Sequence, residues 1–225
     1  MQHVLYEKSK GVSYCTTKAI CISWMYFLSS FIGFLLIGIM TNDVTRCLLT
    51  GVVMHFWAHR SHVWAHSTWP WTWFHGWHHD PDHSKTNWGV FIETYTNVVG
   101  SGGLTLIPYN ILLQLLTGVK LFDNYALFYF ALLYSTFHML NYHILDIKSH
   151  HDHHDDIGCN YGPDIMDVIF ETKKDNEEYE DMNHATINNV GMLIPVILLY
   201  GSKLDPIVFV ERLIKIILKH LRTLL

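Results

Sequence analysis

The feature of this sequence that most constrains its fold is a run from Ala19 to Met40 that contains no charged residue. A stretch of about 20 apolar residues is long enough to cross a bilayer as a helix, whereas the apolar core of a secretory signal peptide usually has about 7–15 residues. We therefore expect residues 19–40 to form a retained transmembrane helix, preceded by a polar N-terminal segment, residues 1–18.

The composition of the whole chain agrees with a membrane protein. Of the 225 residues, 50% are hydrophobic and only 16% are charged, whereas soluble domains contain about 25% charged residues. The formal net charge of −5 and the lack of a basic stripe argue against nucleic acid as a partner. The four cysteines are scattered without a C-x-x-C motif, which favours buried thiols over a disulfide framework or a zinc ribbon.

Further apolar segments predict a bundle of about four transmembrane helices. They run from Cys47 to about Ala58, from about Val98 to Val119 and from Tyr125 to about Tyr142. Residues 187–200 are apolar but short for a span, so we expect a core or re-entrant helix there. From Pro206 onward, apolar and basic residues fall on opposite faces of a helix, which is typical of a helix that lies on an anionic leaflet.

Histidines occur in three groups whose spacing favours metal binding. His55, His59, His62 and His66 lie at offsets 0, 4, 7 and 11, which places all four on one face of a helix. An H-x-x-H-H pattern occurs twice, as His75, His78 and His79 and again as His150, His153 and His154. Residues three and four apart are neighbours on a helix, so each pattern would direct its rings to one side. So many converging imidazoles exceed the roughly four ligands of one tetrahedral ion and predict two metal ions.

The candidate ligands divide into stronger and weaker ones. The stronger candidates are His62, His66, His75, His78, His79, His138, His143, His150, His153 and His154, and the weaker ones are His55, His59 and His151. His138 and His143 are about 140° apart on a regular helix, so both bind only if the helix ends or kinks between them. Asp80 and Asp152 flank the clusters, where they either orient ligands as hydrogen-bond acceptors or are simply solvated.

The predicted topology brings the histidine groups to one side of the membrane. A hairpin formed by residues 98–119 and 125–142 would return the chain to the side of the first two groups. The basic residues near the predicted spans lie mostly on that side, with only Arg46 and Lys120 on the other, so the positive-inside rule makes it cytosolic. The predicted fold is all-α: an integral membrane helical bundle over residues 19–170, with a cytosolic histidine cap, and a C-terminal cap over residues 171–225.

The imidazole ligands limit the choice of metal ion but do not identify a single one. Imidazole suits iron, zinc and copper alike, and zinc can occupy such a site in a purified sample. Two iron ions with open positions for O2 could support attack on an unactivated C–H bond, whereas zinc has no redox chemistry.

Longer motifs point to a family. His62 and His66 are followed after eight residues by His75-Gly76-Trp77-His78-His79, and His150-His151-Asp152-His153-His154 is followed by Asn160-Tyr161-Gly162 and by Asp167-Val168-Ile169-Phe170-Glu171-Thr172. These motifs, which cover roughly residues 50–172, resemble the histidine boxes, the Asn-Tyr pair and the closing Asp-x-x-Phe-Gly-Thr of the fatty acid hydroxylase superfamily, which includes sterol desaturases and C-4 methylsterol oxidases. Glu171 stands where the family has glycine, and an arginine follows His59 rather than His62.

The resemblance implies a di-iron centre on the cytosolic face that uses O2 to hydroxylate or desaturate a sterol or fatty-acyl lipid in the bilayer. It also implies a separate electron donor, such as cytochrome b5 or a reductase, because the chain contains no Gly-rich dinucleotide motif. If the source is eukaryotic, the endoplasmic reticulum is the expected location.

Two alternatives stay open. His78-His79-Asp80-Pro81 together with Phe91-Ile92-Glu93-Thr94 is similar to the plasmanylethanolamine desaturase family, which implies phospholipid desaturation by the same kind of centre. A histidine-rich membrane metal transporter or sensor is the alternative from another functional class, and it would place its ligands near the bilayer midplane.

Overall fold

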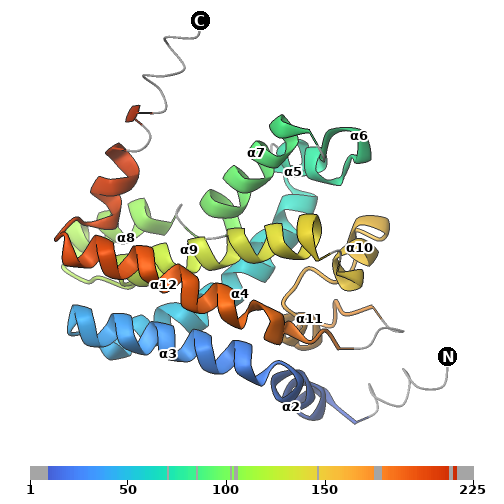
Figure 1. Ribbon diagram of the computed structural model, residues 1–225, viewed down its shortest axis with the longest axis horizontal. Coiled ribbons are helices and arrows are strands. Elements are labelled where there is room, and N and C mark those ends of the chain that lie inside the picture. The colour runs from blue at the N-terminus through green and yellow to red at the C-terminus, as the bar shows by residue number, and fades with distance from the viewer. Residues whose placement is uncertain are drawn as a thin grey trace, which may run out of the picture.

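The computed structural model shows an all-helical protein (Figure 1). It describes residues 10–69, 71–84, 86–101, 103, 106–145, 147–174, 179–212 and 215–216, excluding the side chains of residues 81, 101, 142, 143, 149 and 150. Helix accounts for 80% of the structure, and the described residues contain no strand. The predicted all-α fold class is therefore confirmed.

The first apolar run forms two helices rather than the single predicted one. These are α2 (Val12–Ile22) and α3 (Trp24–Thr41), which are separated at Ser23. The side chain of Asn183 lies at this break, where its Oδ1 accepts from the Met25 backbone N–H at 2.8 Å and its Nδ2 donates to the Ile22 carbonyl at 2.7 Å. A distant side chain thus satisfies backbone groups that the interruption leaves exposed, which stabilises the break.

A tight turn joins α3 to the helix that carries the first histidine group. Asn42 ends α3 in the left-handed region with φ 62°, and Asp43 caps α4 (Val44–Ser67) by accepting from the Arg46 backbone N–H at 3.1 Å. At Gly38 an added Cβ would lie 2.6 Å from Val44 Cα, so only glycine permits this close approach. Helix α4 then continues without interruption from the apolar core to His66.

The core of the bundle lies where α4 and α3 pack against α9 (Asn124–Met139) and α12 (Thr186–Gly201). Buried polar contacts fix these helices together. Asn189 Nδ2 donates to Ser29 Oγ and Ser30 Oγ, each at 2.8 Å, and the Tyr129 hydroxyl donates to the Asn189 carbonyl at 3.1 Å. In a largely apolar interface such bonds set the register of α12 against α3.

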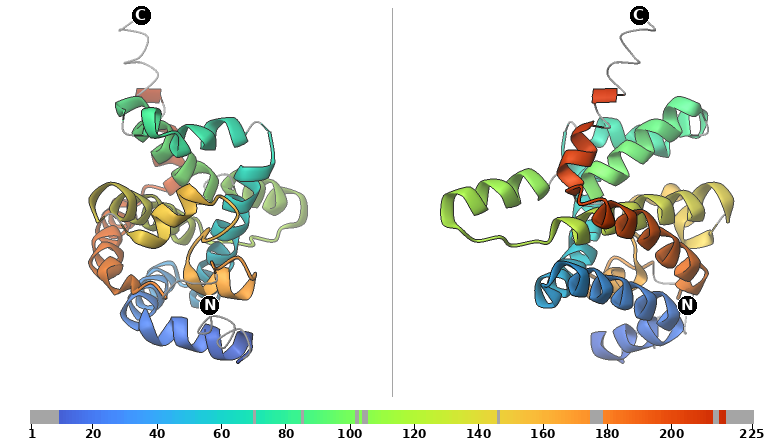
Figure 2. Two further views of the ribbon diagram at one scale, coloured as in Figure 1. Left: turned by 90° about the vertical axis from the view of Figure 1, so that its right-hand side faces the viewer. Right: turned by 60° about the vertical axis from the view of Figure 1, so that its left-hand side comes forward.

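The remaining elements surround this bundle. They are α5 (Trp71–His79), α6 (Pro81–Ser84), α7 (Asn87–Thr96), α8 (Leu106–Thr117), α10 (Lys148–Asp155), α11 (Asp164–Ile169), the π-helices η1 (Asn97–Ser101) and η2 (Leu140–Ile144), and the 3₁₀-helix η3 (Met182–Ala185). Figure 1 shows α5, α10 and α11 toward the end of the bundle opposite α8. The right-hand view of Figure 2 shows α8 projecting away from the other helices.

Within the part of the chain that the structure describes, two helical segments are long and apolar enough to cross a membrane by length and composition, namely Trp24–Thr41 and Met182–Gly201. The second is longer than the expected 187–200, because η3 extends α12 at its start. Leu193, Val196 and Leu199 of α12 lie in the core of the bundle, as a core helix would place them. Residues 98–119 do not form one helix, since η1 and α8 are separate, and the 12 residues of α8 and 16 of α9 are short for a span. A four-span bundle therefore stays a prediction.

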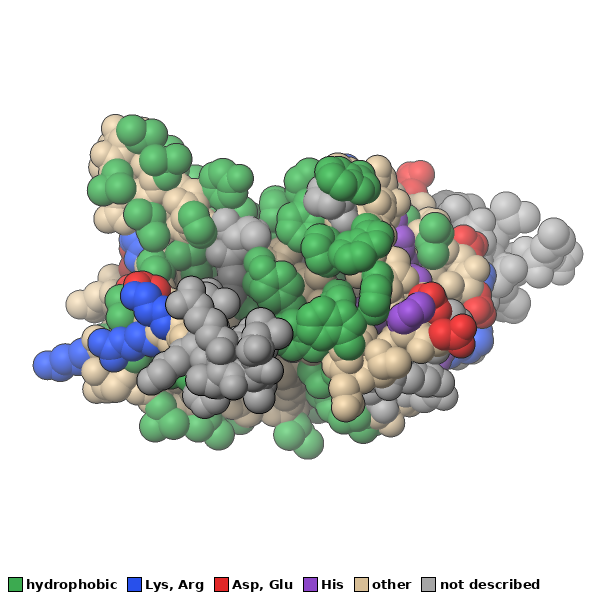
Figure 3. Space-filling model, turned by 90° about the horizontal axis from the view of Figure 1, so that it is seen from above, with side chains coloured by type: hydrophobic (Ala, Val, Ile, Leu, Met, Phe, Trp, Pro, Cys, Tyr) green, Lys and Arg blue, Asp and Glu red, His purple; other side chains and the backbone are tan. Residues whose placement is uncertain are grey.

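The outer surface of the bundle is strongly apolar. Side chains such as Phe31 and Ile39 on α3, Leu115 on α8, and Ile187 and Leu198 on α12 are all more than half exposed. Figure 3 shows apolar side chains over much of one face, with acidic side chains and histidine gathered toward one end. Such extensive exposure of apolar side chains is typical of a protein that contacts a membrane or a partner. Much of the predicted amphipathic helix after Pro206 lies outside the described residues. Residues 206–212, which are described, are helical.

The packing of α3 on α9 gives a direct stability test. An alanine Cβ at Gly33 would lie 2.3 Å from the hydroxyl of Tyr129, a fully buried side chain, and would force that ring away from Asn189. We expect Gly33→Ala to lower the stability of the purified protein by about 1–3 kcal/mol, seen as a lower midpoint of thermal unfolding in detergent. The control is Gly191→Ala in α12, where an added Cβ meets nothing within 4 Å. Equal midpoints for the two variants would contradict this packing.

Candidate metal centre

Five imidazole rings from three helices meet at one end of the bundle. Helix α4 contributes His62 and His66, α5 contributes His75 and His79, and α10 contributes His153. One nitrogen from each ring lies within 4.8 Å of one nitrogen of every other, so a single ion could contact all five. We call this set the five-imidazole group.

The contacts within the five-imidazole group are made by Nε2 atoms. Nε2 of His153 lies 3.1 Å from Nε2 of both His62 and His66, and Nε2 of His75 lies 3.0 Å from that of His66 and 3.1 Å from that of His79. Three of the five rings, His62, His75 and His153, are buried.

Hydrogen bonds of Nδ1 fix which nitrogen carries the proton in His62 and His153. Nδ1 of His62 donates to the Tyr161 carbonyl at 2.8 Å, and Nδ1 of His153 donates to the Cys159 carbonyl at 2.6 Å. Because a carbonyl oxygen can only accept, the proton of each neutral ring is on Nδ1 and its Nε2 has a lone pair. Two lone pairs then face each other at 3.1 Å. This arrangement is unfavourable without a cation between them, so the residues present fit a metal ion.

The electrostatics favour neutral, metal-binding imidazoles. Burial, followed by the proximity of His153, lowers the pKa of His66 from 6.5 to about 4. Burial, then the neighbouring histidines His138 and His153, lowers the pKa of His154 to about 3. The pKa of His62 and of His75 is also well below the usual value, again chiefly through burial. A ligand must be deprotonated to bind a metal, so these shifts keep the donors available at neutral pH.

A second set of rings adjoins the first. Nε2 of His78 lies 3.0 Å from Nε2 of His154, and these two rings form a group with His79. His78 also forms a group with His138 of α9 and Glu93 of α7. His79 belongs to both the five-imidazole group and this second set, so the two potential ion positions are adjacent.

Glu93 is a site residue that the sequence analysis did not select. Its side chain is 1% exposed, with Oε1 2.8 Å from His138 Nδ1 and Oε2 3.1 Å from His78 Nδ1. One feature of the sequence could have pointed to Glu93: it is the single acidic residue in the otherwise uncharged motif Phe91-Ile92-Glu93-Thr94. Membership in a motif did not reveal that it contacts two imidazoles.

Asp167 organises the loop that holds His62. Its Oδ1 accepts from the Tyr161 N–H at 2.9 Å and from the Thr172 hydroxyl at 2.7 Å, and its Oδ2 accepts from the Gly162 N–H at 2.7 Å. The carbonyl of Tyr161, which contacts His62 Nδ1, is therefore fixed through a buried carboxylate.

The weaker candidate ligands lie apart from these groups. His59 is fully buried, and its Nε2 lies 2.9 Å from Thr172 Oγ1 and 3.3 Å from Asp167 Oδ1. Nε2 of His55 lies 3.4 Å from the Tyr26 hydroxyl. His151 is in none of the metal-binding groups found among the described residues. Of the four histidines on one face of α4, the structure brings His62 and His66 to the five-imidazole group.

Some predicted residues have other partners or fall outside the description. Asp80 is 2.7 Å from Nδ1 of His83, a partly exposed residue outside the predicted ligand set, and Asp152 lies within ion-pair distance of Lys148 and Lys174. The side chains of His143 and His150 lie outside the described part of the structure. Between His138 and His143 the backbone changes from α-helix to the π-helix η2, a feature often found at functional sites.

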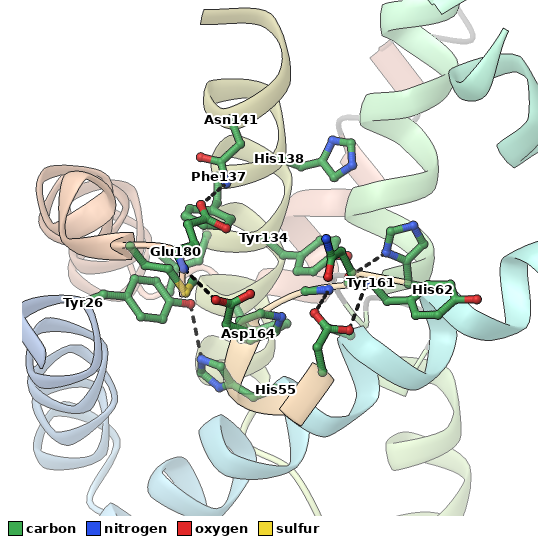
Figure 4. Close-up of a pocket in the computed structure, with 18 residues that line it drawn as sticks. Tyr26, His55, His62, Tyr134, Phe137, His138, Asn141, Tyr161, Asp164 and Glu180 are labelled. Atoms are coloured by element: carbon green, nitrogen blue, oxygen red, sulfur yellow. Dashed lines mark hydrogen bonds between the residues drawn. The ribbon is translucent and has the colours of Figure 1, made fainter. Parts of the chain in front are cut away.

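A pocket extends from the metal-binding rings into the bundle (Figure 4). His62 and His138 lie on one side, and Tyr26 and His55 lie on the other. Its apolar lining comes from Ala58, Phe130, Leu133, Phe137 and Met182, and its polar lining includes Asn141, Asp164 and Glu180. The pocket therefore contacts residues of both metal-binding sets.

Comparison with known proteins does not assign a family. No protein-family model matches the chain, and no curated protein or solved structure matches it. The likeness of its motifs to the fatty acid hydroxylase superfamily stays a prediction, and the geometry of the site is the basis for a functional proposal.

The lowered pKa values predict how pH affects the metal-free protein. Below pH 6.5 the histidines of the unfolded chain bind protons, whereas His66 in the folded chain stays neutral down to about pH 4. The unfolded state then binds more protons, so stability should fall as the pH is lowered from about 6.5 to about 4. Thermal unfolding of chelator-treated protein between pH 7.5 and 5.0 measures this, and His66→Gln should reduce the dependence. A midpoint that rises on acidification would contradict it.

Proposed function

We propose that the protein is a membrane-bound di-iron oxygenase that hydroxylates or desaturates a C–H bond of a lipid. The observation that carries the proposal is the five-imidazole group, in which unprotonated Nε2 atoms face one another. A second set of ligands directly beside it supports two ions rather than one. Iron bound by such nitrogen donors would supply the redox chemistry that activates O2, which zinc does not have.

Different residues would bind the two ions and orient their ligands. His62, His66, His75, His79 and His153 would hold one ion, and His78, His138 and His154 would contribute to the other. The Tyr161 and Cys159 carbonyls keep the protons of His62 and His153 on Nδ1, away from the metal. The hydrophobic side chains around the site limit the access of water.

The pocket supports a lipid substrate. Phe130, Leu133 and Phe137 give it an apolar wall that suits a hydrocarbon segment, and His62 and His138 would lie beside the bond that reacts. The apolar outer surface supports a membrane location, in which the substrate would enter from the bilayer. Hydroxylation and desaturation would use the same centre, so a phospholipid desaturase fits these observations too.

Turnover needs electrons from another protein. The sequence has no dinucleotide-binding fingerprint, so we propose a cytochrome b5-like protein or a reductase as donor. The family that the motifs resemble has its histidine boxes on the cytosolic face, and the basic residues near the predicted spans lie mostly on the histidine side, so the histidine end of the bundle would face the cytosol.

The proposed topology can be tested by cysteine labelling. In a chain whose four native cysteines are replaced, Asp82→Cys and Asp155→Cys should react with an impermeant reagent from the same side of sealed vesicles. Both positions are exposed at the histidine end. Val119→Cys, after α8, should react from the opposite side. Labelling of Asp82→Cys and Asp155→Cys from opposite sides would make a shared cytosolic site impossible.

The function itself is tested by loading the purified chain with ferrous iron. It should hold about two iron ions per chain and consume O2 when given a reductant and sterol, acyl or phospholipid substrates. His153→Ala should lower activity by more than about 100-fold, because loss of even an outer partner of a ligand costs about 10–100-fold.

The control is His83→Ala, since His83 is partly exposed and contacts Asp80 rather than the metal-binding rings. This variant should keep both its iron and its activity. Two bound ions without iron-dependent O2 consumption on any of the lipid classes would instead favour the transport or sensing alternative.

A further inference from the structure

One carboxylate joins three helices at the second set of rings. Glu93 of α7 contacts His138 of α9 through Oε1 at 2.8 Å and His78 of α5 through Oε2 at 3.1 Å. Glu93 and His78 are each 1% exposed and His138 is 7% exposed, so water does not screen these contacts. A carboxylate is placed in such surroundings at a high desolvation cost unless it is paired.

The geometry fixes the orientation of His78. Its Nε2 lies 3.0 Å from Nε2 of His154, and its Nδ1 faces Glu93. The angle of this contact is outside hydrogen-bond geometry, but a lone pair on Nδ1 would face a carboxylate oxygen at 3.1 Å. The charge of Glu93 therefore favours a proton on Nδ1 and leaves the lone pair of Nε2 for a metal. The other oxygen of Glu93 imposes the same tautomer on His138.

The five-imidazole group is held in a different way. There the Nδ1 atoms of His62 and His153 donate to the carbonyls of Tyr161 and Cys159, which are uncharged. A carboxylate acceptor makes an imidazole a stronger base and adds a negative charge close to the ion, whereas a carbonyl adds only a dipole. The two sets of rings are therefore chemically unequal.

We propose that the protein has two unequal metal sites and that Glu93 is the positioning residue of the second one, formed by His78, His138 and His154. This inference deepens the proposed function, but it rests only on metal binding and not on the reaction. Although Glu93 is one of the residues that could contact an ion, its Oε1 accepts from His138 Nδ1 at 2.8 Å and its Oε2 lies 3.1 Å from His78 Nδ1, so in this proposal it acts through the imidazoles.

Glu93→Gln tests the proposal with little change of shape. The amide keeps one acceptor oxygen but presents an NH₂ group to the second imidazole, which must then move its proton to Nε2, where the metal binds. With Co²⁺ as probe, the wild-type chain should bind two ions in two phases. The variant should retain the binding and the visible absorption of one ion, while its affinity for the other falls by about 10–100-fold.

The matched control is Asp123→Asn, which changes another buried carboxylate to its amide. Asp123 caps α9 through the N–H groups of Tyr125 and Ala126 and belongs to none of the metal-binding groups found among the described residues. It should bind two cobalt ions with wild-type affinities, even if its thermal stability is lower.

Glu93→Asp provides a second measurement that does not depend on the folding of Glu93→Gln. It keeps both acceptor oxygens on a shorter side chain, so two cobalt ions should bind, with the second weakened less than in Glu93→Gln. Wild-type affinities in both Glu93 variants, loss of both ions from a folded Glu93→Gln chain, or one cobalt ion in the wild type would overturn the proposal. A wild-type chain with two unequal cobalt sites and no O2 consumption after iron loading would overturn the oxygenase function but not this inference.

Discussion

The structure depends on one electrostatic constraint, which is that unprotonated imidazole nitrogens are brought within about hydrogen-bond distance of one another. His62 and His153 show the constraint most clearly, because backbone carbonyls accept from both Nδ1 atoms and leave two lone pairs in contact. Protonation would relieve the contact in water, but burial opposes it. A cation held between the rings would satisfy both the hydrogen bonds and the burial.

The fold meets this constraint by linking the rings to rigid elements. Helix α4 runs without interruption from Met54 and Ala58 in the apolar core to His62 and His66, so the positions of these two rings follow from the packing of the bundle. The loop before α11 is held by Asp167 and supplies the Tyr161 carbonyl. Core packing and ligand orientation are thus parts of one arrangement, which is how a site achieves a precise geometry.

The sequence predicts the features that depend on local spacing. The period of α4 places His62 and His66 on one face, and the H-x-x-H-H pattern correctly indicates that rings of α5 and α10 converge. It does not predict the break at Ser23, because the break is stabilised by Asn183, a residue about 160 positions away along the chain. For the same reason it misses Glu93, whose partners are on α5 and α9. It also leaves the role of Asp80 open, because proximity along the chain does not show that its partner is His83. Spacing gives neighbours on one helix, whereas the partners of a buried carboxylate are set by packing between helices.

The pocket relates the two metal-binding sets to a possible reaction. It contacts His62 of the five-imidazole group and His138 of the second set, so a molecule within it would lie beside both metal-binding sets. The pocket extends from these rings toward Phe130 and Leu133, residues that also belong to the core of the bundle. An apolar chain placed there would exchange contact with lipid for contact with aromatic and aliphatic side chains, with little net change in solvation. Hydrophobicity would not select which carbon of the apolar chain lies beside the rings. That selection must come from the shape of the pocket and from polar groups such as Asn141 and Glu180.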